Sequence, residues 1–68
     1  MNEDKLNLSV RKFLKQVGIT SQRIIETNIR DAIATNKISL PNEINISANI
    51  KIEKLNIDEK IKGKIEIE

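Results

Sequence analysis

Apolar side chains in the first half of the chain recur at spacings of three and four residues. A first set leads up to Gly18: Leu6, Val10, Phe13, Leu14 and Val17. A second set follows it: Ile25, Ile29, Ala32 and Ile33. Residues three and four apart share one face of a helix, so each set marks an amphipathic helix. The pattern predicts two N-terminal helices, at about residues 4–17 and 20–36.

The residues around Gly18 are the reason to expect two helices and not one. Gly18 follows the last apolar position of the first set and suits the left-handed residue that ends many helices. Thr20 suits the N-cap of a second helix, and Ile19 and Ile24 have the spacing of a hydrophobic staple around such a cap. We therefore expect a tight corner at residues 17–20.

Side chains of the two helices also suggest local contacts. Asn2 is placed to cap the first helix, and acidic residues follow in its first turn, where they stabilise the helix dipole. Glu26 and Arg30 are four residues apart, in the more favourable order for an ion pair. Leu8 departs from the apolar face and is a candidate for contact with a partner.

From residue 43 onward the apolar period changes from three or four to two. Apolar and polar residues alternate over about 43–54 and again over about 60–67. Each segment is typical of a strand with one apolar and one polar face, which antiparallel sheets accommodate. The predicted fold class is α+β: two helices followed by a C-terminal antiparallel β-hairpin, in one small domain of residues 1–68.

Charge pairing favours one register for this hairpin. If Ile52 faces Ile65, Glu53 faces Lys64 across the strands, and opposite charges stabilise such a pair. The tip of the hairpin then falls at residues 58–59. In this register Leu55 and Ile57 are out of phase with the apolar face, which makes both of them candidates for protein contacts.

Composition removes most catalytic chemistry. The 68 residues include no Cys, His, Trp or Tyr, one Phe and only two Gly, and the net charge is +2. Without Cys and His there is no thiol nucleophile, imidazole base or usual zinc ligand. The adjacent acids Glu3-Asp4 and Asp58-Glu59 are typical of solvated ends and turns. We expect no enzyme, no cofactor, no metal and no small-molecule substrate.

Small size instead points to self-association. A chain of this length buries little surface, and domains of its size often need a disulfide, a metal or oligomerisation. With no Cys or His, we expect a homo-oligomer, with a dimer favoured. Two copies would be able to join their hairpins into a four-stranded sheet. Leu8, Leu55 and Ile57 are the candidate contact residues.

Nucleic-acid binding is the alternative. Residues 13–24 have the turn glycine and capping threonine of a helix-turn-helix. Residues 1–39 contain seven basic and four acidic side chains. The candidate phosphate contacts are basic residues on the predicted helices: Arg11, Lys12, Lys15, Arg23 and Arg30. A whole-chain charge of only +2 and the lack of aromatic residues for base stacking favour the protein-contact interpretation.

Nothing in the sequence suggests export or membrane insertion. The first five residues lack the basic and apolar regions of a signal peptide, and no apolar run approaches 18 residues. We expect a cytoplasmic protein without a membrane-spanning segment.

Several segments resemble a family of short uncharacterised bacterial proteins, a domain of unknown function. The similar segments begin with Met1-Asn2-Glu3-Asp4 and include Arg11-Lys12-Phe13-Leu14-Lys15 and Thr20-Ser21-Gln22-Arg23. The chain departs from this family at Ile24, where relatives carry an acid, and around residues 36–43, where relatives are longer. The resemblance implies a small stand-alone bacterial protein with helices first and strands last, and it transfers no activity.

Overall fold

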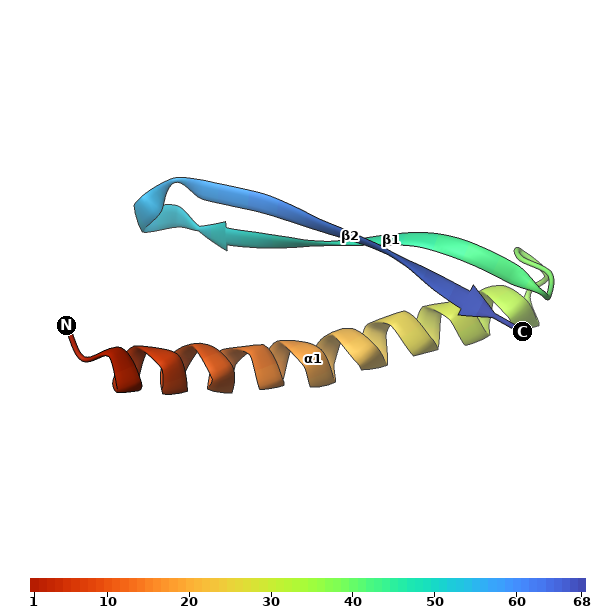
Figure 1. Ribbon diagram of the computed structural model, residues 1–68. Coiled ribbons are helices and arrows are strands. Elements are labelled where there is room, and N and C mark those ends of the chain that lie inside the picture. Colours follow the sequence, from red (N-terminus) through yellow and green to blue (C-terminus); the bar gives the residue numbers. More distant parts are fainter. The chain divides into compact units, whose positions relative to one another are not determined.

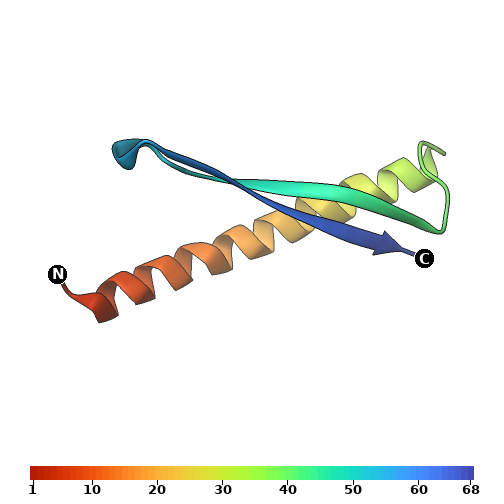
Figure 2. The same ribbon diagram turned by 45° about the horizontal axis from the view of Figure 1, so that its top comes forward.

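The computed structural model describes all 68 residues, which divide into two compact units, Met1–Lys37 and Ile38–Glu68. The first unit contains a helix and the second a β-hairpin, in the order α1, β1, η1, β2. The helix is continuous from end to end in both ribbon views, and the two strands form a twisted ribbon (Figures 1 and 2). The α+β class is confirmed, whereas the single domain stays a prediction.

Helix α1 spans Glu3–Ala34, which is 32 residues or about 48 Å at 1.5 Å per residue. Asn2 caps it, because its side-chain Oδ1 accepts a hydrogen bond of 3.0 Å from the backbone N–H of Lys5. Acidic side chains occupy the first turn, where they interact favourably with the helix dipole. The predicted N-terminal cap is therefore confirmed.

The prediction of two helices is wrong, because α1 runs through residues 17–20 without a corner. Gly18 does not adopt a positive φ, and Thr20 lies inside the helix. Beginning a second helix would require a new and unfavourable nucleus. One interior glycine destabilises a helix by only about 1 kcal/mol. Continuing the helix is therefore more favourable than interrupting it.

Helix α1 ends in a Schellman motif centred on Asn36. The backbone N–H of Lys37 donates to the carbonyl of Ala32 at 2.8 Å, and that of Asn36 donates to Ile33 at 3.1 Å. Asn36 has a φ of 59°, in the left-handed region that asparagine tolerates better than most residues. The helix consequently ends two residues before the predicted boundary.

Strands β1 (Asn42–Ile52) and β2 (Ile57–Ile67) form a two-stranded antiparallel sheet. The 3₁₀ turn η1 (Glu53–Leu55) joins them and ends at Asn56, whose φ is 54°. The backbone N–H of Asn56 donates to the carbonyl at the start of η1 at 3.1 Å. Four residues therefore connect the strands, a common length for a hairpin loop.

The predicted register of the hairpin is wrong. Ile52 pairs with Ile57 and not with Ile65, and β2 begins three residues before the predicted start at residue 60. The prediction gave priority to facing charges, whereas the structure closes a short loop at Asn56 and pairs all eleven residues of each strand. Local turn geometry, which fixes hairpin register, outweighs a few exposed charge pairs.

One unfavourable pair follows from the observed register. Glu43 and Glu66 are direct cross-strand partners, and like charges in such positions repel. A neighbouring lysine relieves this repulsion, since Nζ of Lys64 lies 3.3 Å from Oε1 of Glu43. Both side chains of this ion pair are more than half exposed, so the pair adds little net stability.

The register sorts the hairpin into two faces, because cross-strand partners lie on the same side of a sheet. On the apolar face, ten of the twelve positions are apolar residues or glycine: Ile44, Ile46, Ala48, Ile50, Ile52, Ile57, Ile61, Gly63, Ile65 and Ile67. Asn42 and Glu59 are its two polar members. No side chain in either unit is buried, so neither unit has a core of its own.

Candidate interaction surfaces

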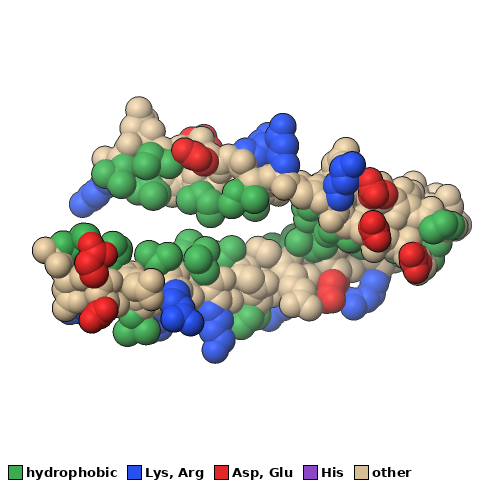
Figure 3. Space-filling model, in the orientation of Figure 1, with side chains coloured by type: hydrophobic (Ala, Val, Ile, Leu, Met, Phe, Trp, Pro, Cys, Tyr) green, Lys and Arg blue, Asp and Glu red, His purple; other side chains and the backbone are tan.

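The apolar stripe of α1 is the first candidate surface. We use this name for the apolar positions that follow one side of the helix: Leu6, Val10, Phe13, Leu14, Val17, Ile24, Ile25, Ile29 and Ala32. Several of its members are about half exposed, including Phe13 at 58% and Ile24 at 56%. Figure 3 shows apolar side chains along the helix and also along the hairpin. Exposed apolar surface of this extent is typical of a protein-binding face.

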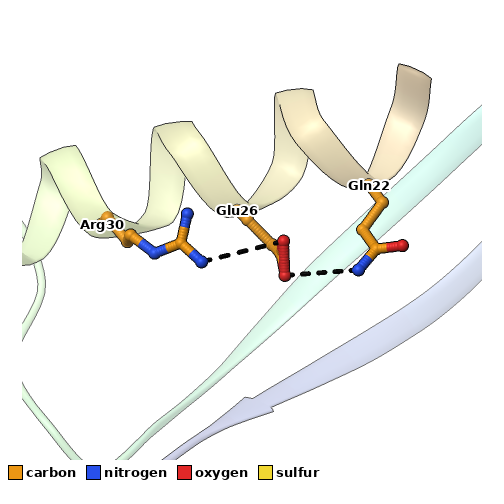
Figure 4. Close-up of polar contacts among 3 residues, drawn as sticks. All are labelled: Gln22, Glu26 and Arg30. Atoms are coloured by element: carbon orange, nitrogen blue, oxygen red, sulfur yellow. Dashed lines mark hydrogen bonds and ion pairs between the residues drawn. The ribbon is translucent and has the colours of Figure 1, made fainter. Parts of the chain in front are cut away.

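The polar side of α1 holds a small hydrogen-bonded group around Glu26 (Figure 4). Its carboxylate accepts a hydrogen bond from Nε2 of Gln22 at 3.4 Å and lies 3.8 Å from Nη2 of Arg30. The predicted ion pair of Glu26 and Arg30 is therefore confirmed. All three residues line a shallow hollow of about 250 Å³ on one side of the helix, together with Ile19, Arg23 and Thr27. The Glu26 side chain, 44% exposed, therefore has one amide and one guanidinium group as neighbours on the same helix.

The basic residues proposed for nucleic acid lie on this single helix. They are exposed and spread along its polar side: Arg11, Lys12, Lys15, Arg23 and Arg30. The helix-turn-helix interpretation of residues 13–24 is wrong, because the segment contains no turn. No second helix is present to place a recognition helix in a groove. Contact of these basic residues with nucleic acid stays an untested prediction.

The three candidate contact residues are all exposed, but they do not share one environment. Leu8 on α1 is 69% exposed and Leu55 in η1 is 64% exposed. Ile57 is 36% exposed and pairs with Ile52 on the apolar face. The prediction that Ile57 is out of phase is therefore wrong, because it rested on the wrong register. Only Leu55 lies outside the strand alternation, at the tip of the hairpin.

The polar face of the hairpin, which the alternation predicts, contains none of the residues predicted as contacts. Its members alternate along both strands: Glu43, Asn45, Ser47, Asn49, Lys51, Asp58, Lys60, Lys62, Lys64 and Glu66. Asn49 donates a side-chain hydrogen bond to Asp58. A shallow hollow of about 570 Å³ borders the three lysines of β2 as well as Asn45 and Ser47. The alternating lysines of residues 60–64 are the signal from which this surface was predictable.

The structure contains neither a cluster of side chains for a metal ion nor a helix suited to cross a membrane. No group of three or more His, Cys, Asp or Glu side chains is placed to hold a metal ion. No helix combines the length and the apolar character needed to cross a membrane.

Comparison with known proteins gives one match. A family model described as "Family of unknown function (DUF6494)" matches residues 1–68, the whole chain. No curated protein and no solved structure matches the chain. The resemblance noted in the sequence is thus confirmed at the level of an uncharacterised family, while bacterial origin and the particular motifs stay predictions.

Proposed function

Since the chain belongs to DUF6494, a family of unknown function, we propose its role from the structure: a small non-enzymatic protein that self-associates and acts through protein–protein contacts. A homodimer is the favoured assembly. One observation carries the proposal, namely that no side chain is buried in either unit. Thirteen large apolar side chains are between 36% and 93% exposed. Burial of such surface is the main favourable term in folding and association.

The composition leaves few other sources of stability. Chains below about 70–80 residues commonly depend on disulfides, a structural metal or oligomerisation. This chain contains no Cys and no His, so it forms no disulfide and lacks the two commonest ligands of structural zinc. Association of copies supplies the missing buried surface without either.

The native mass of the purified protein tests this proposal. Light scattering coupled to size-exclusion chromatography is expected to give about twice the 7.8 kDa of one chain. A mass of one chain at high micromolar concentration would overturn the proposal.

Charged substitutions then locate the contacts. Leu8→Glu and Leu55→Glu replace side chains that are exposed within each unit, so neither should disturb helix or hairpin formation. We expect each to lower the dimer fraction at a fixed concentration. Gln16→Glu is the matched control on α1, because it adds the same charge at an exposed polar position. Equal masses for all three variants and the wild type would exclude Leu8 and Leu55 as contacts.

A further inference from the structure

We propose that two copies of the chain pair through the outer edge of β1, antiparallel, with Ser47 of one copy opposite Ser47 of the other. The inference rests on the proposed self-association and adds, beside the contacts proposed for Leu8 and Leu55, one strand edge and one register. Each strand of the hairpin has one unpaired edge, since the sheet contains only β1 and β2. An unpaired edge presents free backbone donors and acceptors to another strand.

Charges on β1 are complementary to a second β1 in this register. The strand has only two charged side chains, Glu43 and Lys51, and they lie four residues on either side of Ser47. About a two-fold axis at Ser47, Glu43 of each copy faces Lys51 of the other. The same register pairs all eleven residues of β1. The longest possible pairing is therefore also the one that joins opposite charges, which stabilises cross-strand pairs.

The remaining side chains of β1 fit the same arrangement. On the polar face Asn45 of one copy faces Asn49 of the other, and amides can both donate and accept. On the apolar face Ile44 faces Ile50, and the side chains of Ile46 and Ala48 meet. The joined sheet has the order β2-β1-β1-β2, with one continuous apolar face and one continuous polar face. Sheets of three or more strands with an apolar face are stable where a lone hairpin is marginal.

The outer edge of β2 disfavours the same kind of pairing. Lys60, Lys62 and Lys64 alternate along one face of this strand. Every in-phase antiparallel register that pairs more than five residues of β2 with its copy places a lysine opposite a lysine. Directly opposed like charges are destabilising, and lysines on an edge strand hinder addition of further strands. Because the two copies use the same edge, β1, and the remaining β2 edges disfavour pairing, the assembly contains two copies, as is usual for an isologous interface.

Cysteine cross-linking tests the register, because the chain contains no cysteine of its own. Opposed residues in antiparallel strands have Cα atoms about 4.5–5.5 Å apart, within the disulfide range of about 4.4–6.8 Å. Ser47→Cys should therefore give a disulfide-linked dimer under mild oxidation. Lys62→Cys is the matched control, since Lys62 is the cross-strand partner of Ser47 within one hairpin and lies on β2. It should cross-link at least tenfold more slowly.

The outcomes separate the two proposals. If the wild type is a dimer and Ser47→Cys links no faster than Lys62→Cys, the register is wrong and self-association stands. If the wild type is monomeric, both proposals fail. Assemblies larger than two copies would overturn the closed arrangement.

A charge exchange provides an independent readout. Glu43→Lys places two lysines opposite each other in the dimer, while within the hairpin it exchanges the ion pair with Lys64 for one with Glu66. We expect the dimer dissociation constant to rise about tenfold. The variant Glu43→Lys/Lys51→Glu/Asp58→Asn should restore it to within about twofold; the third substitution removes the carboxylate that faces position 51 within the same hairpin and would repel the new glutamate. Residues 43 and 51 are about 26 Å apart along one strand, so restoration reports a contact between copies, and its absence would overturn the register.

Discussion

At the residue scale, two asparagines and not the two glycines hold the left-handed conformations of the chain. Asn36 ends α1 with a φ of 59°, and Asn56 ends η1 with a φ of 54°. Gly18 and Gly63 lie inside a helix and a strand and have no positive φ. Asparagine tolerates the left-handed region because its short side chain forms local hydrogen bonds. The end of α1 and the loop of the hairpin thus both depend on asparagine.

Substitution of Asn56 tests this dependence. Asn56→Ala should lower the free energy of unfolding by about 1 kcal/mol, because alanine is disfavoured at a positive φ. Asn56→Gly should keep or raise stability, since glycine adopts this conformation without steric conflict. Urea unfolding followed by circular dichroism measures both. Asn7→Ala inside α1 is the control and should not destabilise, so equal effects at Asn7 and Asn56 would contradict the turn assignment.

Among residue-scale features, two local contacts were predictable from the sequence, whereas the helix end expected at Gly18 and the cap expected at Thr20 are absent. The Asn2 cap and the ion pair of Glu26 with Arg30 depend only on residues three or four positions apart, and both are present. The environment of Ile57 was not predicted, because it depends on which distant residue pairs with it. Local spacing determines the first kind of contact, and register determines the second.

At the element scale, α1 shows why two good capping signals do not divide a helix. Val17, Ser21 and Ile25 continue the four-residue spacing across Gly18, and all three are half-buried. The apolar residues before and after Gly18 therefore lie on the same side of one continuous helix, so the chain does not need to turn at this point. A glycine and a threonine can each be accommodated inside a helix at a cost of about 1 kcal/mol or less.

Two alanine substitutions distinguish a continuous helix from a corner. Gly18→Ala should raise the free energy of unfolding by about 1 kcal/mol, since alanine has the higher helix propensity and an added Cβ meets no atom within 4 Å. Thr20→Ala should be neutral or stabilising for the same reason. At a corner both would destabilise, through a strained positive φ and a lost cap. Denaturant unfolding of the two variants beside the wild type decides between these cases.

The hairpin was predictable as an element but not in its register. The alternation of apolar and polar residues predicted both strands and their antiparallel arrangement. The register prediction failed because it compared charge pairs only and did not include Asn56 as the end of a four-residue loop. In the observed register Glu43 lies opposite Glu66, and Glu59 is the one charged residue on the apolar face. Both are unfavourable, but this register pairs all eleven residues of each strand.

At the scale of the whole molecule, the proposed self-association would link stability to concentration. A protein whose copies bury one another's apolar surface has no well-defined stability apart from its concentration. The sequence predicts self-association only from the small size and the lack of Cys and His. The proposed pairing through β1 depends in addition on the bounds of the two strands, which the sequence did not predict.

Thermal unfolding at several concentrations follows from this link. For a dimer that unfolds to two separate chains, a tenfold higher concentration stabilises the dimer by about 1.4 kcal/mol. With about 2.1 cal/mol/K of unfolding entropy per residue over two chains, Tm should rise by about 5 °C for each tenfold increase. Calorimetry across two decades of concentration measures the slope. A Tm that does not change would show that unfolding is independent of association.

The three lysines that alternate along β2, Lys60, Lys62 and Lys64, also bear on fibril formation. Isoleucine and lysine alternate at its end, Lys60-Ile61-Lys62 and Lys64-Ile65, and the segment contains no proline. In a cross-β stack each lysine would lie about 4.8 Å from its copy in the next layer. Each such pair repels by about 0.9 kcal/mol in water, so three lysines disfavour every added layer by about 3 kcal/mol. The same lysines would keep an isoleucine-rich hairpin in solution during synthesis, before any second copy reaches it.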